Sequence, residues 1–536
     1  MIQDSSRRYR DREAIVDGAR RMTYGELDER VEEVTRAAIA FGVGHGDRVA
    51  IWAQNSTEWI LAALGALSAG AAIVPLNTRY KGHEAGFILE KSRSSVLFVA
   101  DGFLDIDYVK LLRDAMGEPN EEQPVSGLGD LRGIVVFGSR SAAGTTSWES
   151  FLAGALQVTN EQSAARTSAI RRDDLSDILF TSGTTGRPKG AMLTHGQTLR
   201  TFADWSEIIG LREGDRYLIV NPFFHVFGYK AGFISAFMRG ATVIPMAVFD
   251  VEGVMRCIEA ERVSVFPGPP TLHQSLLNHP RRSDFDLSSL RLCTTGAAEV
   301  PIEMILRMRR EMSYQTIVTG YGLTECTGTA TMCRHDDPPE RIAYTSGRAI
   351  PDVEVRIVDD HMNDLSRGEQ GEIVVRGYNV MQAYYDEPEE TAATIDTDGW
   401  LHTGDLGTMD NEGYVAITGR KKDMYIVGGF NVYPAEIENV LLAHPAVADV
   451  AVVGAPDERL GEVGFAFVVP RADQQIRTED LIAWTRERLA NFKVPRHVEI
   501  VPTLPTNAVG KTLRYELRDQ AKNLVRRVAE RSPDQR

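Results

Sequence analysis

The chain has 536 residues, of which 43% are hydrophobic and 25% charged, so it is long enough for two or more domains and has an ordinary globular composition. Its net charge of −16 argues against a nucleic-acid or anionic-membrane binder, because such proteins need a basic surface. The four cysteines form no CxxC pair and no cluster with histidine, so neither a zinc site nor a disulfide framework is indicated, and a reducing cytosol fits best.

The N-terminal part of the chain alternates between helix and strand patterns. A capping box at Thr23–Glu26 begins a helix that runs toward Gly42. Further helices are predicted from Thr57 and from His83. Strands are predicted at 48–53, 72–76, 96–100 and 133–138. This alternation predicts an α/β fold with a largely parallel, helix-covered sheet.

Neither the first 21 residues nor the longest apolar stretch has the pattern of a targeting or membrane segment. Residues 1–21 are polar and rich in arginine, so no secretory signal is predicted. The longest apolar stretch, 60–76, is interrupted by Pro75 and falls short of the roughly 20 residues of a membrane span. It is interpreted as a buried helix that continues into a strand, and a cytoplasmic location without a transmembrane segment is predicted.

Later strands and a charge asymmetry indicate a second domain. The strands are predicted at 242–245, 263–268, 354–359 and 371–377, and the last two are expected to form a meander because a short turn separates them. Residues 420–536 contain 18 Lys and Arg and 16 Asp and Glu. Their net charge is therefore +2, which leaves −18 on the rest of the chain. We therefore predict an N-terminal domain of residues 1–419 and a C-terminal domain of residues 420–536.

The strongest local motif is the string TSGTTGRPKG at 181–190. Its glycines let backbone N–H groups approach an anion, its hydroxyl side chains add donors, and Lys189 adds a positive charge. The string can therefore hold phosphate groups, although it matches neither the Walker loop nor the dinucleotide-binding motif. On composition alone, an exposed turn between two strands is an equal alternative.

Six further strings occur in a fixed order: NPFFHVFG (221–228), TTGAA (294–298), GYGLTE (320–325), WLHTGD (400–405), GRKKDMYIVGGFNVYPAEIE (419–438) and LPTNAVGK (504–511). With these motifs the whole chain resembles the adenylate-forming superfamily of acyl-CoA synthetases, luciferases and peptide-synthetase adenylation domains. The resemblance implies a ligase that uses ATP to convert a carboxylic acid into acyl-AMP with release of pyrophosphate. It then transfers the acyl group to the thiol of coenzyme A.

The resemblance assigns nucleotide contacts to several of these motifs. The assigned ATP-binding residues are Thr181, Ser182, Gly183, Thr184, Thr185, Gly186, Lys189, Gly296, Ala297, Ala298, Gly320, Tyr321, Gly322, Asp405 and Arg420. The Tyr321 ring is expected to stack on adenine. The Asp405 carboxylate is suited to two ribose hydroxyls, because it can accept two hydrogen bonds. Packing and turn formation are the structural alternatives for these two residues.

The resemblance also assigns catalytic and acid-binding residues. Lys511 is expected to bridge the α-phosphate and the substrate carboxylate. Thr324 is expected to bind the α-phosphate and Glu325 to hold Mg²⁺, which prefers oxygen ligands. His225 is assigned to positioning or gating of the acid. The residues expected to line the acyl pocket are His225, Val226, Phe227, Gly228 and Phe233. Taken singly, a surface lysine, a helix cap and a core histidine are the structural alternatives.

The implied fold class is α/β, with a large N-terminal domain of several subdomains and helix-covered sheets, and a small mobile α+β C-terminal domain. The C-terminal domain is expected to rotate between the two half-reactions, with Lys422 at the hinge. Gly428 and Gly429 would then lie beside the tunnel for coenzyme A. An ordinary hairpin turn is the alternative for this glycine pair.

The substrate acid is suggested by longer strings. NPFFHVFGYKAG (221–232) and FPGPPTLHQSLLNHP (266–280) are most similar to bacterial ligases for the bicyclic propanoate of steroid-ring degradation. A medium-chain fatty, cyclic or aryl acid is the alternative, because apolar pockets discriminate weakly. A luciferase-like oxygenase, acyl transfer to a separate carrier protein, a non-catalytic nucleotide sensor and a homodimeric state are left open.

Overall fold

The computed structural model forms two compact units, which are described separately. The first comprises Met1–Glu354 and Val375–Leu401, and the second comprises Val355–Val374 and His402–Arg536. The structure describes residues 1–117, 125, 127–138, 143–181, 188–296, 300–421, 423–427, 430–457, 459–472, 474, 476–489, 491–507 and 511–531. The boundary expected between Gly419 and Arg420 falls inside the second unit and stays a prediction.

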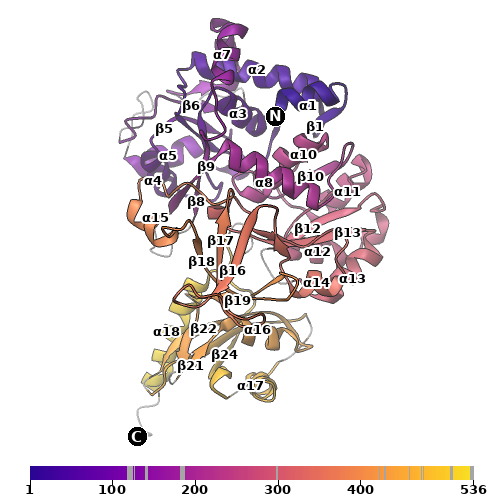
Figure 1. The fold of residues 1–536 in the computed structure, drawn as a ribbon, viewed down its shortest axis with the longest axis vertical. Coiled ribbons are helices and arrows are strands. Elements are labelled where there is room, and N and C mark those ends of the chain that lie inside the picture. Colours follow the sequence, from indigo (N-terminus) through magenta and orange to yellow (C-terminus); the bar gives the residue numbers. More distant parts are fainter. Residues whose placement is uncertain are drawn as a thin grey trace. The chain divides into compact units, whose positions relative to one another are not determined.

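The largest sheet of the first unit has seven strands in the order β7-β6-β5-β3-β4-β8-β9. Its strands β5, β6, β8 and β9 are labelled in Figure 1. All neighbouring pairs are parallel except β8 and β9, which are antiparallel. The strands are β3 (Arg48–Trp52), β4 (Ala72–Pro75), β5 (Ser94–Val99), β6 (Gly133–Val136), β7 (Thr146–Ser147), β8 (Leu175–Thr181) and β9 (Lys189–Thr194). The predicted helix-covered parallel sheet is therefore confirmed.

Helix α2 (Tyr24–Ala40) shows why the predicted elements form. The Thr23 hydroxyl accepts a hydrogen bond from the Glu26 N–H group, and the Glu26 carboxylate accepts one from the Thr23 N–H group, so the capping box is complete. Its buried face includes Val34, which lies against Gly65 of α3 (Thr57–Ser68). The apolar stretch 60–76 is this buried helix α3 followed by β4, as predicted.

No helix among the described residues is both long enough and apolar enough to span a membrane.

Two four-stranded sheets complete the first unit. One has the order β10-β11-β1-β2 and the other the order β12-β13-β14-β15. Their strands are β1 (Glu13–Asp17), β2 (Arg20–Thr23), β10 (Arg216–Ile219), β11 (Thr242–Pro245), β12 (Leu292–Gly296), β13 (Thr316–Tyr321), β14 (Thr331–Met332) and β15 (Arg348–Ala349). The strand predicted at 263–268 is wrong in extent, because only Val265 forms a bridge, to Tyr217 and Leu292. Pro267 has no N–H group with which to extend the pairing.

Most of the remaining α-helices of the first unit lie between these strands in the sequence, while α1 precedes them and α15 follows them. They are α1 (Ile2–Tyr9), α4 (Gly82–Ser92), α5 (Tyr108–Met116), α6 (Trp148–Ala153), α7 (Asn160–Ser168), α8 (His195–Ile208), α9 (Val226–Gly228), α10 (Ser235–Arg239), α11 (Val251–Glu261), α12 (Pro270–Leu277), α13 (Ile302–Glu311), α14 (Pro339–Tyr344) and α15 (Pro388–Thr394). A π-helical turn, Tyr229–Ile234, joins α9 to α10.

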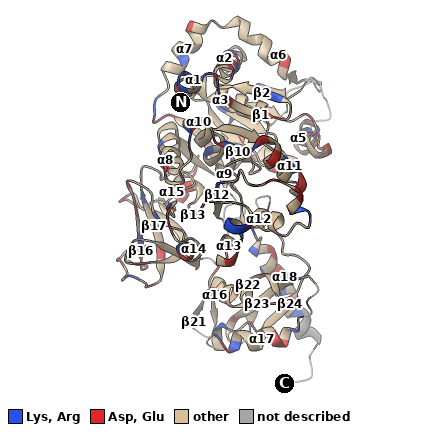
Figure 2. Cartoon of the chain, turned by 90° about the vertical axis from the view of Figure 1, so that its right-hand side faces the viewer, with Lys and Arg blue, Asp and Glu red and all other residues tan. Residues whose placement is uncertain are grey.

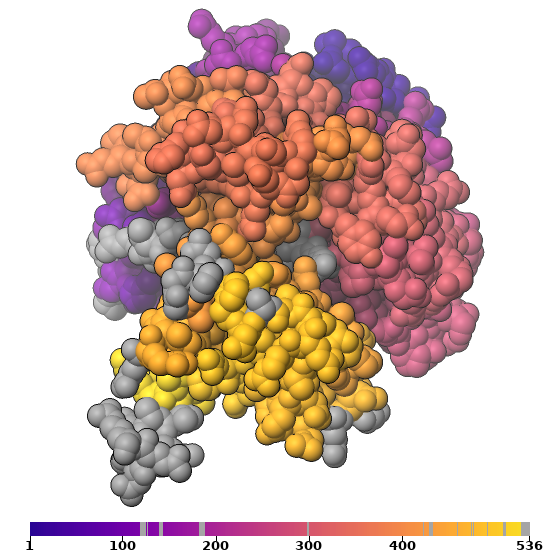
Figure 3. All heavy atoms as spheres, turned by 60° about the horizontal axis from the view of Figure 1, so that its bottom comes forward, coloured from indigo at the N-terminus to yellow at the C-terminus, as the bar shows by residue number. Residues whose placement is uncertain are grey.

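The second unit is an α+β domain, drawn in orange and yellow in Figure 3. Its sheets have the orders β16-β17-β18-β19 and β21-β20-β23-β22, with β24 also paired to β23. The strands are β16 (Val353–Val358), β17 (Gly371–Gly377), β18 (Leu401–Met409), β19 (Val415–Arg420), β20 (Tyr425–Val427), β21 (Phe430–Val432), β22 (Val447–Asp457), β23 (Gly461–Pro470) and β24 (His497–Ile500).

Three helices cover the two faces of the second of these sheets. Val452 of β22 packs in one core cluster with side chains of α16 (Pro434–Leu442) and α17 (Thr478–Arg486). The next residue, Val453, packs in another cluster with α18 (Arg514–Arg531). Because successive strand side chains point to opposite faces, α18 covers one face of the sheet and the other two helices cover the other.

Candidate active site

The phosphate-loop motif connects two antiparallel strands. Thr181 is the last residue of β8, Lys189 is the first residue of β9, and the two residues pair across the strands. The loop residues assigned to ATP between them, Ser182, Gly183, Thr184, Thr185 and Gly186, lie outside the described residues. The strand expected after the motif is confirmed as β9, so the motif does not lead into a helix as a Walker loop does.

Thr181 lies beside Glu325, the predicted metal ligand. Glu325 belongs to a short 3₁₀ turn, Thr324–Cys326, that follows β13. Its Oε1 atom accepts hydrogen bonds from the Thr181 hydroxyl at 3.4 Å and from the Tyr384 hydroxyl at 2.7 Å. Its backbone oxygen accepts a hydrogen bond from the Met381 N–H group at 2.7 Å. Two sequence motifs and the segment before α15 therefore meet at one carboxylate.

Tyr384 also contacts the loop lysine. The Lys189 ammonium lies 5.4 Å from the centre of the Tyr384 ring and forms an ion pair with Glu390 of α15. Burial, together with the charge of Glu325, raises the pKa of Tyr384 above its ordinary value. The phenol therefore stays protonated and donates to Glu325 at neutral pH.

The other nucleotide motifs lie at the ends of two parallel strands. Gly296 at the end of β12 lies opposite Gly320 near the end of β13, and Tyr321 ends β13 half-buried. A Cβ atom on Gly322 would lie 2.4 Å from the Gly328 oxygen, so only glycine fits there. Ala297 and Ala298 lie outside the described residues.

The aromatic motif at 221–228 leads into a short helix. The exposed His225 caps α9, because its Nδ1 atom accepts a hydrogen bond from the Phe227 N–H group at 3.1 Å. Val226 is buried, and its Cγ1 atom would lie 2.2 Å from a Cβ atom on Gly328. The aromatic motif therefore packs against the turn that carries Glu325. Phe233 lies in a fully buried aromatic cluster with Trp59.

A buried ion pair lies under this motif. The Lys230 ammonium is 2.8 Å from Asp177 Oδ1, and both side chains have no exposed surface. Lys230 also donates a hydrogen bond to the Thr198 hydroxyl of α8 at 2.9 Å. Burial lowers the pKa of Lys230, and the Asp177 charge opposes that shift. The pair joins the π-helical turn to β8, the strand that ends at Thr181.

The expected ribose contacts lie in the second unit. Asp405 of β18 pairs in register with Arg420 of β19, and their side chains form an ion pair of 2.9 Å. The preceding Gly404 has φ +67°, a conformation that favours glycine, and its N–H group donates to Glu372 at 3.1 Å. Asp405 is 3% exposed, so the guanidinium supplies its counter-charge. The hinge residue Lys422 lies outside the described residues.

Lys511 is an exposed residue of the second unit. The Lys511 N–H group donates to Asn507 Oδ1 and the Asn507 N–H group donates to the Lys511 oxygen, each at 2.8 Å. Three residues later, Arg514 forms two hydrogen bonds with Glu438 of α16, at 2.6 and 2.7 Å. These contacts fix the chain on both sides of Lys511. Gly428 and Gly429 lie outside the described residues.

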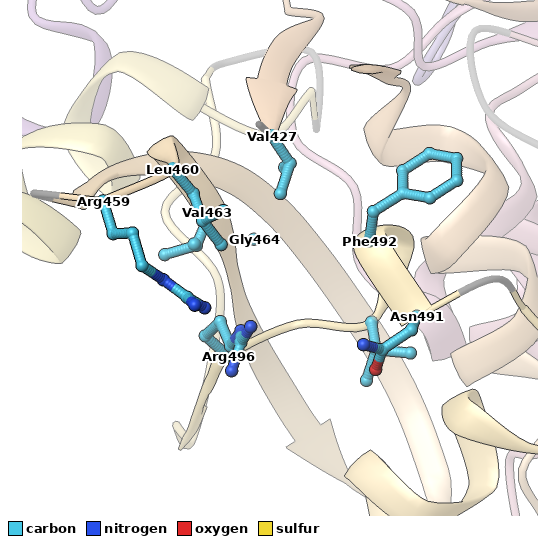
Figure 4. Close-up of a pocket in the computed structure, with 9 residues that line it drawn as sticks. Val427, Arg459, Leu460, Val463, Gly464, Asn491, Phe492 and Arg496 are labelled. Atoms are coloured by element: carbon cyan, nitrogen blue, oxygen red, sulfur yellow. The ribbon is translucent and has the colours of Figure 1, made fainter. Parts of the chain in front are cut away.

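A pocket of about 230 Å³ opens in the second unit (Figure 4). Arg459 and Arg496 line this pocket together with Phe492, and Figure 4 draws the Phe492 ring on the other side of the view from the two arginines. In Figure 2, which colours the ribbon by residue type, Lys and Arg are interspersed with Asp and Glu along the chain. The pocket therefore combines positive charge with an aromatic face.

A family described as AMP-binding enzyme matches residues 2–385, and a family described as AMP-binding enzyme C-terminal domain matches residues 436–511. The chain belongs to the AMP-binding enzyme family. The superfamily resemblance of the motifs is thereby confirmed.

Relatives of this AMP-binding enzyme are named as CoA ligases. The chain is 48% identical to a 7a-methyl-1,5-dioxo-octahydro-1H-inden-4-yl propanoyl:CoA ligase of Rhodococcus jostii, over 97% of this chain and 98% of that protein. A Mycobacterium tuberculosis ligase of the same name is 48% identical over 95% of this chain and 96% of that protein. The crystal structure of the anthranilate CoA ligase AuaEII in complex with anthranoyl-AMP superposes with a TM-score of 0.86, at 29% identity, over 98% of this chain and 97% of that one.

These findings establish the reaction class. This AMP-binding enzyme is an ATP-dependent, AMP-forming carboxylate–CoA ligase that acts through an acyl-AMP intermediate. ATP, coenzyme A and a small carboxylic acid are its substrates.

Sequence reasoning missed several residues that surround the predicted ones. Tyr384 contacts Glu325, and Glu390 contacts Lys189. Lys230 pairs with Asp177 in the core. One signal was present, because Asp177 and Lys230 are charged residues within otherwise apolar or aromatic strings. The segment containing Tyr384 matches none of the motifs used above, so only the fold reveals its position.

Proposed function

We propose that the acid activated by this enzyme is the bicyclic propanoate that remains from steroid-ring degradation. The observation that carries the proposal is the 48% identity, over nearly the full length, to two ligases named for a methyl-dioxo-octahydroindene propanoate. The strings 221–232 and 266–280 support the same acid. Val226 and Phe227, which are proposed to line the acyl pocket, are apolar and aromatic, and such a lining would suit a bulky bicyclic acid.

The proposed first half-reaction takes place around Glu325. An oxygen of the acid attacks the α-phosphorus of ATP, the bond to the bridging oxygen breaks, and pyrophosphate leaves. The residues 181–189 are proposed to hold the β- and γ-phosphates, Thr324 the α-phosphate, and Tyr321 the adenine. Asp405, with Arg420, is proposed to bind the ribose. Catalysis is then mainly positioning and neutralisation of charge.

Mg²⁺ fits the donor set beside the phosphates. Glu325 presents a carboxylate whose Oε1 atom is already oriented by Tyr384 and Thr181, and Mg²⁺ is commonly held by one or two carboxylates plus substrate phosphates. We propose that Glu325 holds the ion, which would neutralise developing phosphate charge. Among the described residues no group of three or more ligands forms a dedicated metal cage, in keeping with an ion that binds together with ATP.

The proposed second half-reaction uses the C-terminal domain in another orientation. Lys511 contacts the α-phosphate and the acid carboxylate during adenylation, and rotation about Lys422 then removes it. The thiolate of coenzyme A attacks the acyl carbonyl and AMP leaves. Gly428 and Gly429 are proposed to border the thiol tunnel, where side chains would obstruct it.

The pocket of Figure 4 is proposed to receive the phosphate groups of coenzyme A. Arg459 and Arg496 supply positive charge, and Phe492 supplies a face for a base. Replacement of Arg496 by Met is expected to raise the KM for coenzyme A and to leave pyrophosphate release unchanged.

A panel of acids tests the substrate. Purified enzyme with ATP, Mg²⁺ and coenzyme A is assayed for AMP with the bicyclic propanoate, octanoate, ferulate and anthranilate. We expect the bicyclic acid to give the highest kcat/KM. A higher value for any other acid would refute this substrate. Failure of every acid to support exchange of labelled pyrophosphate into ATP would instead contradict adenylation.

A further inference from the structure

The positive charge of the phosphate-loop motif, carried by Lys189, is neutralised by an ion pair with Glu390. The side chain of Lys189 is only 14% exposed, whereas that of Glu390 is 39% exposed. The ammonium also faces the Tyr384 ring. A cation with so little access to water needs a nearby counter-charge, because desolvation of an unpaired charge is costly. Glu390 supplies that counter-charge within the first unit.

Contacts of the neighbouring residues hold Glu390 near the loop independently of its own charge. The Tyr385 N–H group donates to the Gly190 oxygen at 2.8 Å, next to Lys189. The Tyr384 N–H group donates to the Thr391 hydroxyl at 2.9 Å, and Lys91 pairs with Glu387 at 2.8 Å. The start of α15 is therefore anchored to β9 and α4. Neutralising Glu390 alone should leave this anchoring intact.

We propose that Glu390 is a placeholder carboxylate, which neutralises Lys189 when no phosphate is bound and competes with the phosphates of ATP and pyrophosphate for the same ammonium. The inference rests on the proposed role of Lys189 as a phosphate ligand. Coulomb attraction at close range is strong in a partly desolvated site, so two anions cannot both use one ammonium fully. Glu390 makes phosphate binding weaker and makes release of pyrophosphate easier. It acts through Lys189 and is a positioning residue.

The variant Glu390→Gln removes the competing charge and keeps the side-chain size. We expect both the KM for ATP and the inhibition constant of pyrophosphate to fall about two- to fivefold, the range of a part-exposed ion pair. The matched control is Glu389→Gln, which makes the same charge change one residue earlier on the same helix at an exposed position. The control should leave both constants unchanged.

The variant Lys189→Met separates this inference from the proposed function. If Lys189 binds phosphate, this variant raises both constants, and Glu390→Gln added to it has no further effect. Both constants unchanged in Lys189→Met would overturn the phosphate role and the inference with it. Higher constants in Lys189→Met but no decrease in Glu390→Gln would overturn the placeholder alone. A decrease that persists in the double variant would also overturn it, because the effect would then bypass Lys189.

Discussion

The two units support their candidate residues in different ways. In the first unit, Thr181 and Tyr321 end strands of buried sheets, and a fully buried ion pair, Asp177–Lys230, lies beneath the aromatic motif. In the second unit, Lys511 is exposed and is held by Asn507 and by a more accessible ion pair between Arg514 and Glu438. Core packing therefore fixes Thr181 and Tyr321 in the first unit, whereas polar contacts near the surface fix Lys511 in the second.

The largest expected effect is on the stability of the first unit. Replacement of Lys230 by Met leaves Asp177 charged and unpaired at a position with no exposed surface. Breaking such a buried pair destabilises a protein by about 3–5 kcal/mol. Denaturant unfolding, followed by amide exchange in β8 and α8, should show this loss.

A double variant tests whether the loss comes from the uncompensated charge. Asp177→Leu combined with Lys230→Met removes both charges, and exchanges of buried pairs for apolar residues are often neutral. The double variant should recover most of the stability lost in the single one. Equal destabilisation of both variants would show that packing around Lys230, and not the ion pair, supports the motif.

The next largest effect is expected from Lys511, whose replacement should slow the first half-reaction and not the second. Replacement by Ala should lower the rate of acyl-AMP formation by about 10²–10³-fold, the usual loss when one preorganised electrostatic contact is removed. Thioester formation from preformed acyl-AMP and coenzyme A should be retained. Single-turnover assays of each step measure the division, and an equal loss in both steps would contradict it.

A smaller effect is expected from the ion pair that anchors the chain just after Lys511. Arg514→Met removes two hydrogen bonds to the Glu438 carboxylate, which is 10% exposed. Hydrogen bonds to charged groups contribute about 1.5–3 kcal/mol, so amide exchange in α18 should report a local opening that is easier by that amount.

The matched control for the anchoring pair lies one turn further along α18. Arg518→Met breaks the hydrogen bond to Asp423 from a more exposed position, and the exchange should change by less than about 1 kcal/mol. A similar change in both variants would mean that the helix as a whole, and not the bidentate pair, holds the chain next to Lys511.

The sequence predicted the parallel sheet well, because its signals are local. The capping box at Thr23 and the apolar run 60–76 determine their own structures, and both formed as expected. The strand at 263–268 was overextended because apolar residues outweighed the proline at position 267. The error arises because a hydrophobic pattern does not show which residues have the backbone N–H group that strand pairing requires.

The candidate site was predictable where a motif carries it and unpredictable where a distant segment completes it. Thr181 and Glu325 were named from separate motifs, and the fold brings them within 3.4 Å. Tyr384 is 59 residues from Glu325, and no local pattern encodes that contact. The same holds for Glu390 and Lys189, which are 201 residues apart. Such partners depend on tertiary packing, which one sequence does not display.

The smallest expected effect tests the contact that the sequence did not reveal. Tyr384→Phe removes the 2.7 Å hydrogen bond to Glu325 and keeps the ring beside Lys189. Because the bond orients Glu325 and does not itself contact the ion, we expect only part of its energy, about 1 kcal/mol, to affect Mg²⁺ binding. The Mg²⁺ concentration for half-maximal adenylation should then rise about fivefold, with the rate at saturating Mg²⁺ retained. Tyr385→Phe is the neighbouring control and should leave this concentration unchanged. An unaltered Mg²⁺ dependence in Tyr384→Phe would show that Glu325 is oriented by its own turn and by Thr181 alone. Core packing of the first unit would then be enough to hold the carboxylate in place.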